Sequence, residues 1–305
     1  MRQASRRTIL KARINTALLR WYQKNARELP WRGERDSYRI LLSEVMLQQT
    51  QVARVLEKYP LFLDRFPTLR RLARARISAV IKAWRGMGYN HRALRLQKLA
   101  RIVVNDFNSK LPENISELVS LPGVGRYTAH ALACFAFGKN VAVVDTNVAR
   151  VLNRLYPPAN PRTSSRDTDI WRLAERHLPR RNAHDWNQAL MDLGATTCTA
   201  AIPRCDVCPL SELCPSAHRV PHKKGHAKRM EPGRDGIPNR IYRVRIVEVL
   251  RNLRPGSSIA SSILSRAVKT DFTTRDRRWF EALLRSLEHD GLVQLHGATR
   301  VSLPD

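Results

Sequence analysis

Four of the five cysteines lie within seventeen residues, in the segment CTAAIPRCDVCPLSELC. Their spacing is C-x6-C-x2-C-x5-C, and they are Cys198, Cys205, Cys208 and Cys214. Thiolates this close along a chain can converge on one metal centre. One close pair with two outlying cysteines suits the asymmetric loop of a [4Fe–4S] cluster, whereas zinc ribbons and fingers usually use two close pairs. The spacing favours an iron–sulfur cluster and leaves structural zinc as the alternative.

Two carboxylates stand where apolar segments meet polar ones. Asp145 follows the apolar run VAVV and precedes TNVARVL, a position typical of a helix N-cap. Glu44, in LLSEVMLQQTQ, either shares a polar helix face with Gln48 or is partly buried. A partly buried carboxyl has a raised pKa and suits a general acid. From the residues alone, capping and a solvated face are the simpler readings.

The turn LPGVG, residues 121–125, separates two helical patterns. Gly123 and Gly125 can adopt backbone angles that other residues avoid. Their small size also lets main-chain N–H groups approach a phosphate at the start of the next helix. An ordinary corner between helices is the competing interpretation. The following Arg126 and the net charge favour phosphate binding.

The charge of the chain is far from balanced. Among 305 residues, Lys and Arg total 54 and Asp and Glu total 26, which gives a formal net charge of +28. The segment 65–101 contains eleven basic residues and no acidic one. Such clustering indicates a polyanionic partner, most simply nucleic acid. We find no signal-peptide pattern and no apolar run long enough to span a membrane, so we expect a soluble intracellular protein.

Helical periodicity dominates the chain before residue 240. Prolines separate short helical patterns, which predicts an all-α body ending near residue 214. Residues 215–240 are rich in Pro, Gly and charge and indicate a linker. The remaining residues predict helices followed by the hairpin GLVQL…TRVSL, an order that fits a small winged-helix-like module.

Together these segments resemble the helix-hairpin-helix (HhH-GPD) DNA glycosylases, and most closely the adenine mismatch glycosylase family. The resemblance covers residues 15–216 and rests on LPWR, LSEVMLQQTQ, GMGYNHRA, LPGVGRYTA, VVDTNVARVL, MDLGATTC and the cysteine spacing. It implies a [4Fe–4S] cluster domain of residues 1–30 and 137–216, and a helical domain with the hairpin at 31–136. A linker at 217–240 and the C-terminal module at 241–305 would complete the chain. The implied partner is double-stranded DNA with a mismatched or damaged base, bound by a monomer.

The resemblance also implies roles for individual residues. Glu44 matches the acid that protonates adenine, and Asp145 the carboxylate that stabilises the sugar cation. Asn147 matches a residue that positions the acid, and Tyr127 one that positions the sugar. Gln49 matches the wedge that fills the gap left by the flipped base. The residues implied to contact DNA or the base are Arg32, Leu47, Gln48, Gln49, Tyr89, Gly123, Gly125 and Arg126.

Three departures from related patterns refine the prediction. Endonuclease III-type lyases place at the position of Tyr127 a lysine that forms a Schiff base, so we expect base release without strand cleavage. Thymine mismatch glycosylases share this tyrosine, which keeps thymine or uracil opposite guanine as the alternative target. Residues 240–305 are shorter and more helical than the nudix-like domain of typical adenine enzymes, and DTN replaces their usual DGN. A DNA-binding protein without catalysis is a further alternative, which the two carboxylates disfavour.

Overall fold

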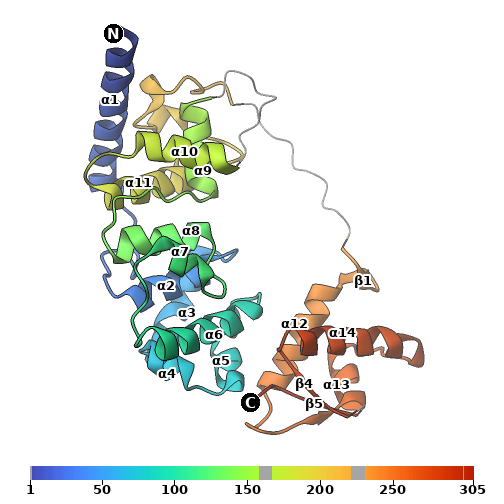
Figure 1. Cartoon of the computed structure of the whole chain (residues 1–305). Helices are drawn as coiled ribbons and strands as arrows, with labels where there is room; N and C mark the ends of the chain where they lie inside the picture. The colour runs from blue at the N-terminus through green and yellow to red at the C-terminus, as the bar shows by residue number, and fades with distance from the viewer. Residues whose placement is uncertain (1, 158–166, 221–230, 298) are drawn as a thin grey trace. The chain divides into compact units, whose positions relative to one another are not determined.

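A computed structural model describes residues 2–157, 167–220, 231–297 and 299–305 (Figure 1). The chain divides into two compact units. Among the described residues, the first unit consists of 2–40, 113–119, 124–157 and 167–220, and the second of 41–112, 120–123, 231–297 and 299–305. The structure is mostly helical, as the periodicity predicts.

The first unit is built around α11 (Ala183–Thr196). This helix packs against α1 (Arg2–Asn25) and α9 (Thr146–Leu155), and its residues from Trp186 to Gly194 are all buried. An apolar stripe on α9, with Val148, Val151 and Leu152 buried, explains why that helix lies against α11. The other elements here are α7 (Ile115–Ser120), α8 (Arg126–Ala131), the π-helical turn η1 (Leu132–Ala136), α10 (Asp167–His177), and the 3-10 turns η2 (Cys205–Val207) and η3 (Ser211–Leu213).

The helical part of the second unit surrounds α6 (His91–Asp106), which packs against α4 (Leu69–Ala73) and α5 (Ile77–Ala83). Helix α3 (Val52–Arg65) contacts α5, and α2 (Ser37–Leu47) begins in the first unit and ends in this one. Phe62, Leu72 and Trp84 are fully buried at the centre. Prolines end or interrupt these helices, and Thr68 caps α4 by accepting a hydrogen bond from the Arg71 N–H.

The C-terminal residues begin with a two-stranded hairpin, so the chain forms regular structure before residue 240. The two strands are β1 (Gly233–Arg234) and β2 (Ile237–Pro238). The elements that follow are α12 (Asn239–Arg251), β3 (Ile259–Ala260), α13 (Ser261–Val268), the 3-10 turn η4 (Thr274–Asp276), α14 (Arg277–His289), β4 (Gln294–His296) and β5 (Arg300–Ser302). Residues 221–230 of the expected linker lie outside the described residues.

A three-stranded antiparallel sheet of order β3-β5-β4 closes the C-terminal part. Val301 pairs with both Ile259 and Leu295, and the β4–β5 pair forms the hairpin that the sequence predicts. Tyr242, Leu264 and Phe280 fill the core between the sheet and the helices. Ile81 of α5 is buried in the same core, which therefore continues into the helical part of the second unit.

No helix in the described part of the chain has the length and apolar character required to cross a membrane.

Candidate active site and DNA interface

Asp145 caps helix α9 after an apolar segment that is fixed from α11. Asn187 of α11 accepts a hydrogen bond from the Val143 N–H at 2.9 Å and donates to the Val141 carbonyl at 2.9 Å. The chain then turns, and Asp145 Oδ1 accepts from the Val148 N–H at 2.7 Å. The predicted N-cap is thus confirmed, and the half-buried carboxylate has a fixed position.

The second oxygen of Asp145 starts a chain of hydrogen bonds. Asn147 Nδ2 donates to Asp145 Oδ2 at 2.9 Å, and Arg150 Nη2 donates to Asn147 Oδ1 at 2.7 Å. Arg150 also donates to the Gly194 carbonyl at 2.6 Å and to the Cys198 carbonyl at 2.8 Å. Because both carboxylate oxygens accept a directed bond, the Asp145 side chain is oriented from two sides, and the carboxylate is linked to the first cysteine of the loop.

Gly194 leaves the room that Asn147 occupies. A Cβ built on Gly194 would lie 2.7 Å from the Asn147 Cβ and 3.1 Å from its carbonyl oxygen. Real Cβ atoms essentially never approach so closely, so only glycine fits at this position without a shift of α9 or α11. The glycine of MDLGATTC therefore serves close helix packing directly behind Asp145 and Asn147.

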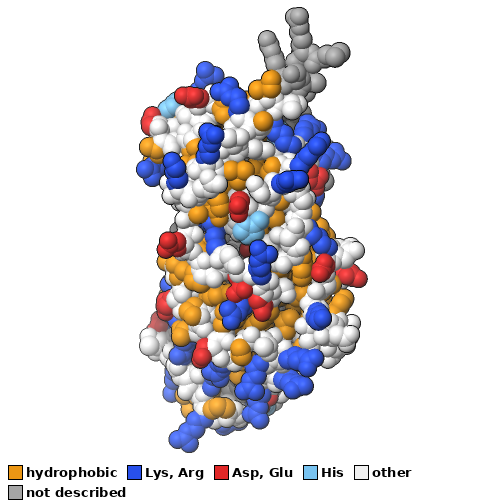
Figure 2. Space-filling view, turned by 90° about the vertical axis from the view of Figure 1, so that its left-hand side faces the viewer, with side chains coloured by type: hydrophobic (Ala, Val, Ile, Leu, Met, Phe, Trp, Pro, Cys, Tyr) orange, Lys and Arg blue, Asp and Glu red, His pale blue; other side chains and the backbone are white. Residues whose placement is uncertain are grey.

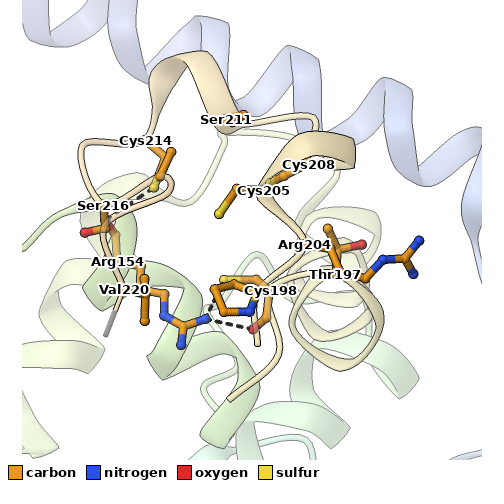
Figure 3. Close-up of a pocket in the computed structure, with 12 residues that line it drawn as sticks. Arg154, Thr197, Cys198, Arg204, Cys205, Cys208, Ser211, Cys214, Ser216 and Val220 are labelled. Carbon is orange, nitrogen blue, oxygen red and sulfur yellow. Dashed lines mark hydrogen bonds between the residues drawn. The ribbon is translucent and has the colours of Figure 1, made fainter. Parts of the chain in front are cut away.

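The four cysteines line one pocket, together with Arg154 (Figure 3). They come from separate short turns after α11, and all four are half-buried. Arg154 Nη1 donates to Cys198 Sγ at 3.2 Å and to the Thr199 carbonyl at 2.7 Å. The described residues contain no group of three or more His, Cys, Asp and Glu that could hold a metal ion.

Burial raises the pKa of the Cys208 thiol to about 11, and the neighbouring cysteines add to this shift. Burial also raises the pKa of Cys214. Thiolates in one pocket repel one another, and a positively charged centre between them would offset this repulsion. Four sulfur donors on a common pocket are the donor type of a thiolate-bound cluster, although the described structure does not bring three of them together as ligands of one ion.

The fifth cysteine, Cys134, has the structural role that its apolar context predicts. It is 1% exposed in η1, and Asn187 Nδ2 donates to its sulfur at 3.3 Å. Burial raises the pKa of its thiol to about 11. Such a thiol is unreactive and acts as a small apolar side chain.

Glu44 lies in α2 and is 6% exposed, in a segment whose apolar side chains are almost completely buried. Of the two positions considered for it, a solvated helix face is therefore wrong and a buried one is correct. Glu44 belongs to the second unit, whereas Asp145, Asn147 and Tyr127 belong to the first. Tyr127 is half-buried, one residue into helix α8.

One buried arginine holds together two turns that carry predicted DNA contacts. Arg92 is 4% exposed, and its Nη1 donates to the Val45, Met46 and Gln48 carbonyls at 2.9, 2.9 and 2.6 Å. Its Nη2 donates to the Met87 carbonyl at 2.8 Å, the Gly88 carbonyl at 3.2 Å and Thr50 Oγ1 at 2.9 Å. Desolvation by burial lowers the pKa of this guanidinium to about 10.

The two turns present exposed side chains in unusual backbone conformations. Gln49 is exposed with a φ of 56°, and Tyr89 is 53% exposed with a φ of 42°. Leu47, the last residue of α2, and Gln48 directly precede Gln49, and both are half-buried. Positive φ is rare for residues with a side chain and marks positions that surrounding structure must enforce. The hydrogen bonds of Arg92 hold both turns in place. In the sequence, Arg92 stands out only as one of many basic residues.

The hairpin between α7 and α8 needs one glycine rather than two. Gly123 has a φ of 81°, and a Cβ there would lie 3.2 Å from the Arg95 Cβ. Gly125 caps α8 in an ordinary extended conformation with a φ of −91°, and no atom lies within 4 Å of a Cβ built on it. The prediction of a special backbone angle is therefore wrong for Gly125. Arg126 is exposed, with its guanidinium 4.1 Å from the centre of the Trp171 ring.

Arg32 is committed to a buried ion pair. Its Nη1 and Nη2 donate to Asp192 Oδ2 and Oδ1 at 2.5 and 2.7 Å, and Arg27 Nε donates to Asp192 Oδ1 at 2.6 Å. Asp192 is completely buried in α11. The sequence analysis missed this carboxylate, although it lies in the motif MDLGATTC. The pair ties the LPWR segment to α11, so this guanidinium has a structural role.

Basic side chains are spread over the surface, as the net charge requires. Figure 2 shows one face of the molecule, on which Lys and Arg side chains are more frequent than Asp and Glu. A formal net charge of +28 is typical of nucleic-acid-binding proteins.

Comparison with known proteins defines the class. The model of the HhH-GPD superfamily of base excision DNA repair proteins matches residues 42–176. The solved structure of a thermostable thymine-DNA glycosylase is 33% identical, with a TM-score of 0.66, and the match covers 70% of this chain and 99% of that chain. Endonuclease III in a trapped covalent complex with DNA is 25% identical, with a TM-score of 0.60 over 68% of this chain and 97% of that chain.

A curated relative extends over nearly the whole chain. An adenine DNA glycosylase of Mycobacterium tuberculosis is 41% identical over 302 residues, which cover 95% of this chain and 93% of the relative. The chain belongs to the adenine DNA glycosylase family within the HhH-GPD superfamily.

Proposed function

We propose that this protein is a monofunctional DNA glycosylase of base excision repair that removes adenine mispaired with 8-oxoguanine or guanine. The observation that carries the proposal is the 41% identity to an adenine DNA glycosylase across nearly the whole of both chains. The family resemblance of the sequence motifs points the same way, and the surroundings of each carboxyl group within its own unit suit the chemistry.

Breaking an N-glycosidic bond requires an acid for the leaving base and a negative charge near the sugar. In the proposed reaction, Glu44 gives its proton to adenine, the bond between base and sugar breaks, and the bonding electrons leave with the base. The sugar is left as an oxocarbenium-like cation next to Asp145. Water then adds to this cation, a proton returns to Glu44, and an abasic sugar and free adenine are the products. A covalent ester between Asp145 and the sugar is a variant of the same step.

The structure gives each carboxyl group surroundings suited to its proposed role. Glu44 is 6% exposed, and a carboxyl group shielded from water suits the proposed general acid. Asp145 accepts two hydrogen bonds that stabilise and orient the carboxylate. Asn147 acts through one of these bonds. Tyr127 positions the sugar, and because it has no amine to form a Schiff base, the enzyme stops at the abasic site.

Cys198, Cys205, Cys208 and Cys214 would hold a [4Fe–4S] cluster, with single-ion zinc as the alternative. The cluster would supply a positively charged centre that keeps the cysteine loop folded. Arg150 and Arg154 bind carbonyl groups of this loop from α9. Folding of the loop therefore supports α9, which carries Asp145.

DNA contacts are proposed for three sets of residues, in addition to the general attraction of the positive charge for DNA. Gln49 and Tyr89 stand exposed on turns held by Arg92. Gln49 would fill the gap left by the flipped base, and Tyr89 would contact the DNA. The hairpin residues Gly123, Gly125 and Arg126 would hold a backbone phosphate. Leu47, Gln48 and Arg32 would line the base pocket.

The division into a cluster domain, a helical domain and a C-terminal module belongs to the same proposal. The helix–strand order of residues 239–305, with one strand after α12 and a hairpin after α14, supports a winged-helix-like module. We propose that the protein acts as a monomer.

A second candidate is removal of thymine or uracil opposite guanine. The observation that favours it is the 33% identity to a thymine-DNA glycosylase of nearly complete coverage, together with the tyrosine shared at position 127.

The test uses four duplexes that contain A opposite 8-oxoguanine, A opposite G, T opposite G and U opposite G, with alkali to reveal abasic sites. We expect cleavage after alkali on the two adenine duplexes. Cleavage of the T:G and U:G duplexes alone would establish the second candidate, and cleavage without alkali would contradict the monofunctional assignment. Asp145→Asn should remove the activity, and Asp169→Asn, an exposed carboxylate on α10, is the matched control.

A further inference from the structure

The C-terminal residues 239–305 are packed onto the helical part of the second unit. Ile81 of α5 is fully buried in the same cluster as Ile246 and Leu250 of α12. Ile77 and Leu94 pack against this cluster from α5 and α6. A shared apolar core holds two parts of a chain in a fixed arrangement, unlike a module tethered only by a linker.

Polar contacts at this boundary surround one buried arginine. Lys82 Nζ donates to the Leu253 carbonyl at 2.8 Å, and Arg85 forms a 2.6 Å ion pair with Glu248, both at partly exposed positions. Arg251 differs, because its side chain is only 3% exposed. Its Nε donates to the Ile81 carbonyl at 3.0 Å. A buried guanidinium is retained only where its donors are used.

Arg251 Nη1 donates to Glu248 Oε2 at 3.0 Å, and the third nitrogen, Nη2, reaches the turn that carries Tyr89. Arg251 Nη2 donates to Asn90 Oδ1 at 2.9 Å. Asn90 is 8% exposed and caps α6, but its side chain makes no capping bond to the helix. Its oxygen is therefore oriented by Arg251 and not by the helix that follows.

The turn before Asn90 needs such support because Tyr89 adopts a left-handed conformation that is unfavourable for a residue with a side chain, whereas its glycines adopt positive φ freely. Gly86, Gly88 and Tyr89 have φ values of 82°, 67° and 42°. Arg92 holds this turn from within the helical part through the Met87 and Gly88 carbonyls. The side facing α12 is held by Arg251.

We propose that Arg251 is a positioning residue for DNA binding, acting from the C-terminal module through Asn90 on the exposed ring of Tyr89. The inference rests on the proposed function, which places Tyr89 against DNA. The module thereby contributes to substrate binding without touching the base itself.

The experiment compares the full-length variants Arg251→Met and Arg251→Lys. Arg254→Met is the matched control, since Arg254 is an exposed arginine of the same module. Hydrogen–deuterium exchange of the free protein is measured over residues 84–92. Duplex affinity is measured for A opposite 8-oxoguanine in an Asp145→Asn background, and the single-turnover rate is measured at saturating protein.

Of the three hydrogen bonds that Arg251→Met removes, one reaches the turn, at Asn90. We expect the loss of this charge-assisted bond to speed exchange in residues 86–91 by about tenfold and to weaken duplex binding by about tenfold. The single-turnover rate should stay within about threefold, because the acid and the carboxylate are unaffected. Arg251→Lys should lie between the wild type and Arg251→Met, and Arg254→Met should match the wild type. A purely structural role would lower the folded fraction and leave the affinity of the folded protein unchanged, which would overturn the proposal.

Asn90→Ala keeps the test decisive if Arg251→Met does not fold. It removes the same bond while leaving α12 intact, and we expect the same faster exchange and weaker binding. Where Arg251→Met does fold, the effects of Asn90→Ala and Arg251→Met on exchange and affinity should be less than additive in the double variant. Unchanged exchange over residues 86–91 in Asn90→Ala would also overturn the proposal. Hydrogen–deuterium exchange does not depend on catalysis. A protein that released no adenine would refute the proposed function, whereas the exchange data would still decide whether Arg251 positions the turn.

Discussion

Replacing Arg92 by methionine tests whether one side chain organises the Gln49 and Tyr89 turns. Methionine fills a similar volume without the six hydrogen bonds that the guanidinium donates. Three acceptors keep at least a share of another donor. The single hydroxyl hydrogen of Thr50 is shared between the Gln48 and Met87 carbonyls, and Trp84 Nε1 reaches the Gly88 carbonyl. The loss therefore falls mainly on the Val45 and Met46 carbonyls.

Two buried acceptors that lose a charged donor cost about 1–3 kcal/mol each. Removing the buried charge returns part of this, because Arg92 Nε has no hydrogen-bond partner within the described structure. We expect a net loss of about 2–4 kcal/mol in the free energy of unfolding. Duplex affinity should fall by at least about tenfold, since both turns lose their shared anchor.

Urea unfolding followed by circular dichroism measures the stability, and fluorescence anisotropy with a labelled duplex measures the affinity. Lys98→Met is the matched control, because Lys98 is an exposed cation on the same helix. The reasoning is refuted if Arg92→Met loses less than about 0.5 kcal/mol, the range of an ordinary surface substitution. An unchanged affinity in a folded Arg92→Met protein would refute the link to the two turns.

Three further predictions follow from contacts in the first unit. Gly194→Ala places a Cβ against Asn147 and should lower stability by about 1–3 kcal/mol and slow base release. Thermal melting and single-turnover kinetics measure the two effects. Ala195→Ser, at the exposed neighbouring position, should change neither. Burial lowers the pKa of His177 from 6.5 to about 4, so between these pH values the unfolded state binds more protons and the free energy of unfolding falls as pH falls. For this half-buried group we expect the free energy of unfolding to be about 1–2 kcal/mol lower at pH 5 than at pH 7. Urea unfolding at the two pH values measures this difference, and His177→Gln should remove it. Cys208→Ser should lower the bound iron and the visible absorbance of the purified protein. One equivalent of zinc and no iron in the wild-type protein would contradict the proposed cluster.

Local patterns predicted the parts of the structure that depend on neighbouring residues. The N-cap at Asp145 follows from an apolar run that ends before a helical pattern, and the buried Cys134 follows from its apolar neighbours. The β4–β5 hairpin follows from two short apolar segments around Gly297. Each of these is decided by a few consecutive residues.

Long-range partners could not be predicted in the same way. Arg92 and Arg251 are two of 54 basic residues, and nothing in their local sequence distinguishes a buried anchor from a solvated charge. Asp192 is likewise a polar residue in an apolar helix until Arg27 and Arg32 are brought to it from 160 or more positions away. Such roles are set by tertiary packing, which charge counts and periodicity do not encode.

At Gly125 the local pattern predicts a feature that the structure does not have. The GxG pattern suggests two unusual backbone angles, whereas the turn needs a left-handed residue only at Gly123. The pattern fixes where the chain turns but not which residue takes the strained conformation.

The most direct test of the proposed function is to identify the base that the protein releases. A duplex with adenine opposite 8-oxoguanine is incubated with excess protein, and the released base is identified by mass spectrometry. The account predicts free adenine from the wild type and none from Asp145→Asn, which should still bind the duplex within about threefold of the wild-type affinity. Free adenine from Asp145→Asn at the wild-type rate, or no adenine from the wild type, would contradict it.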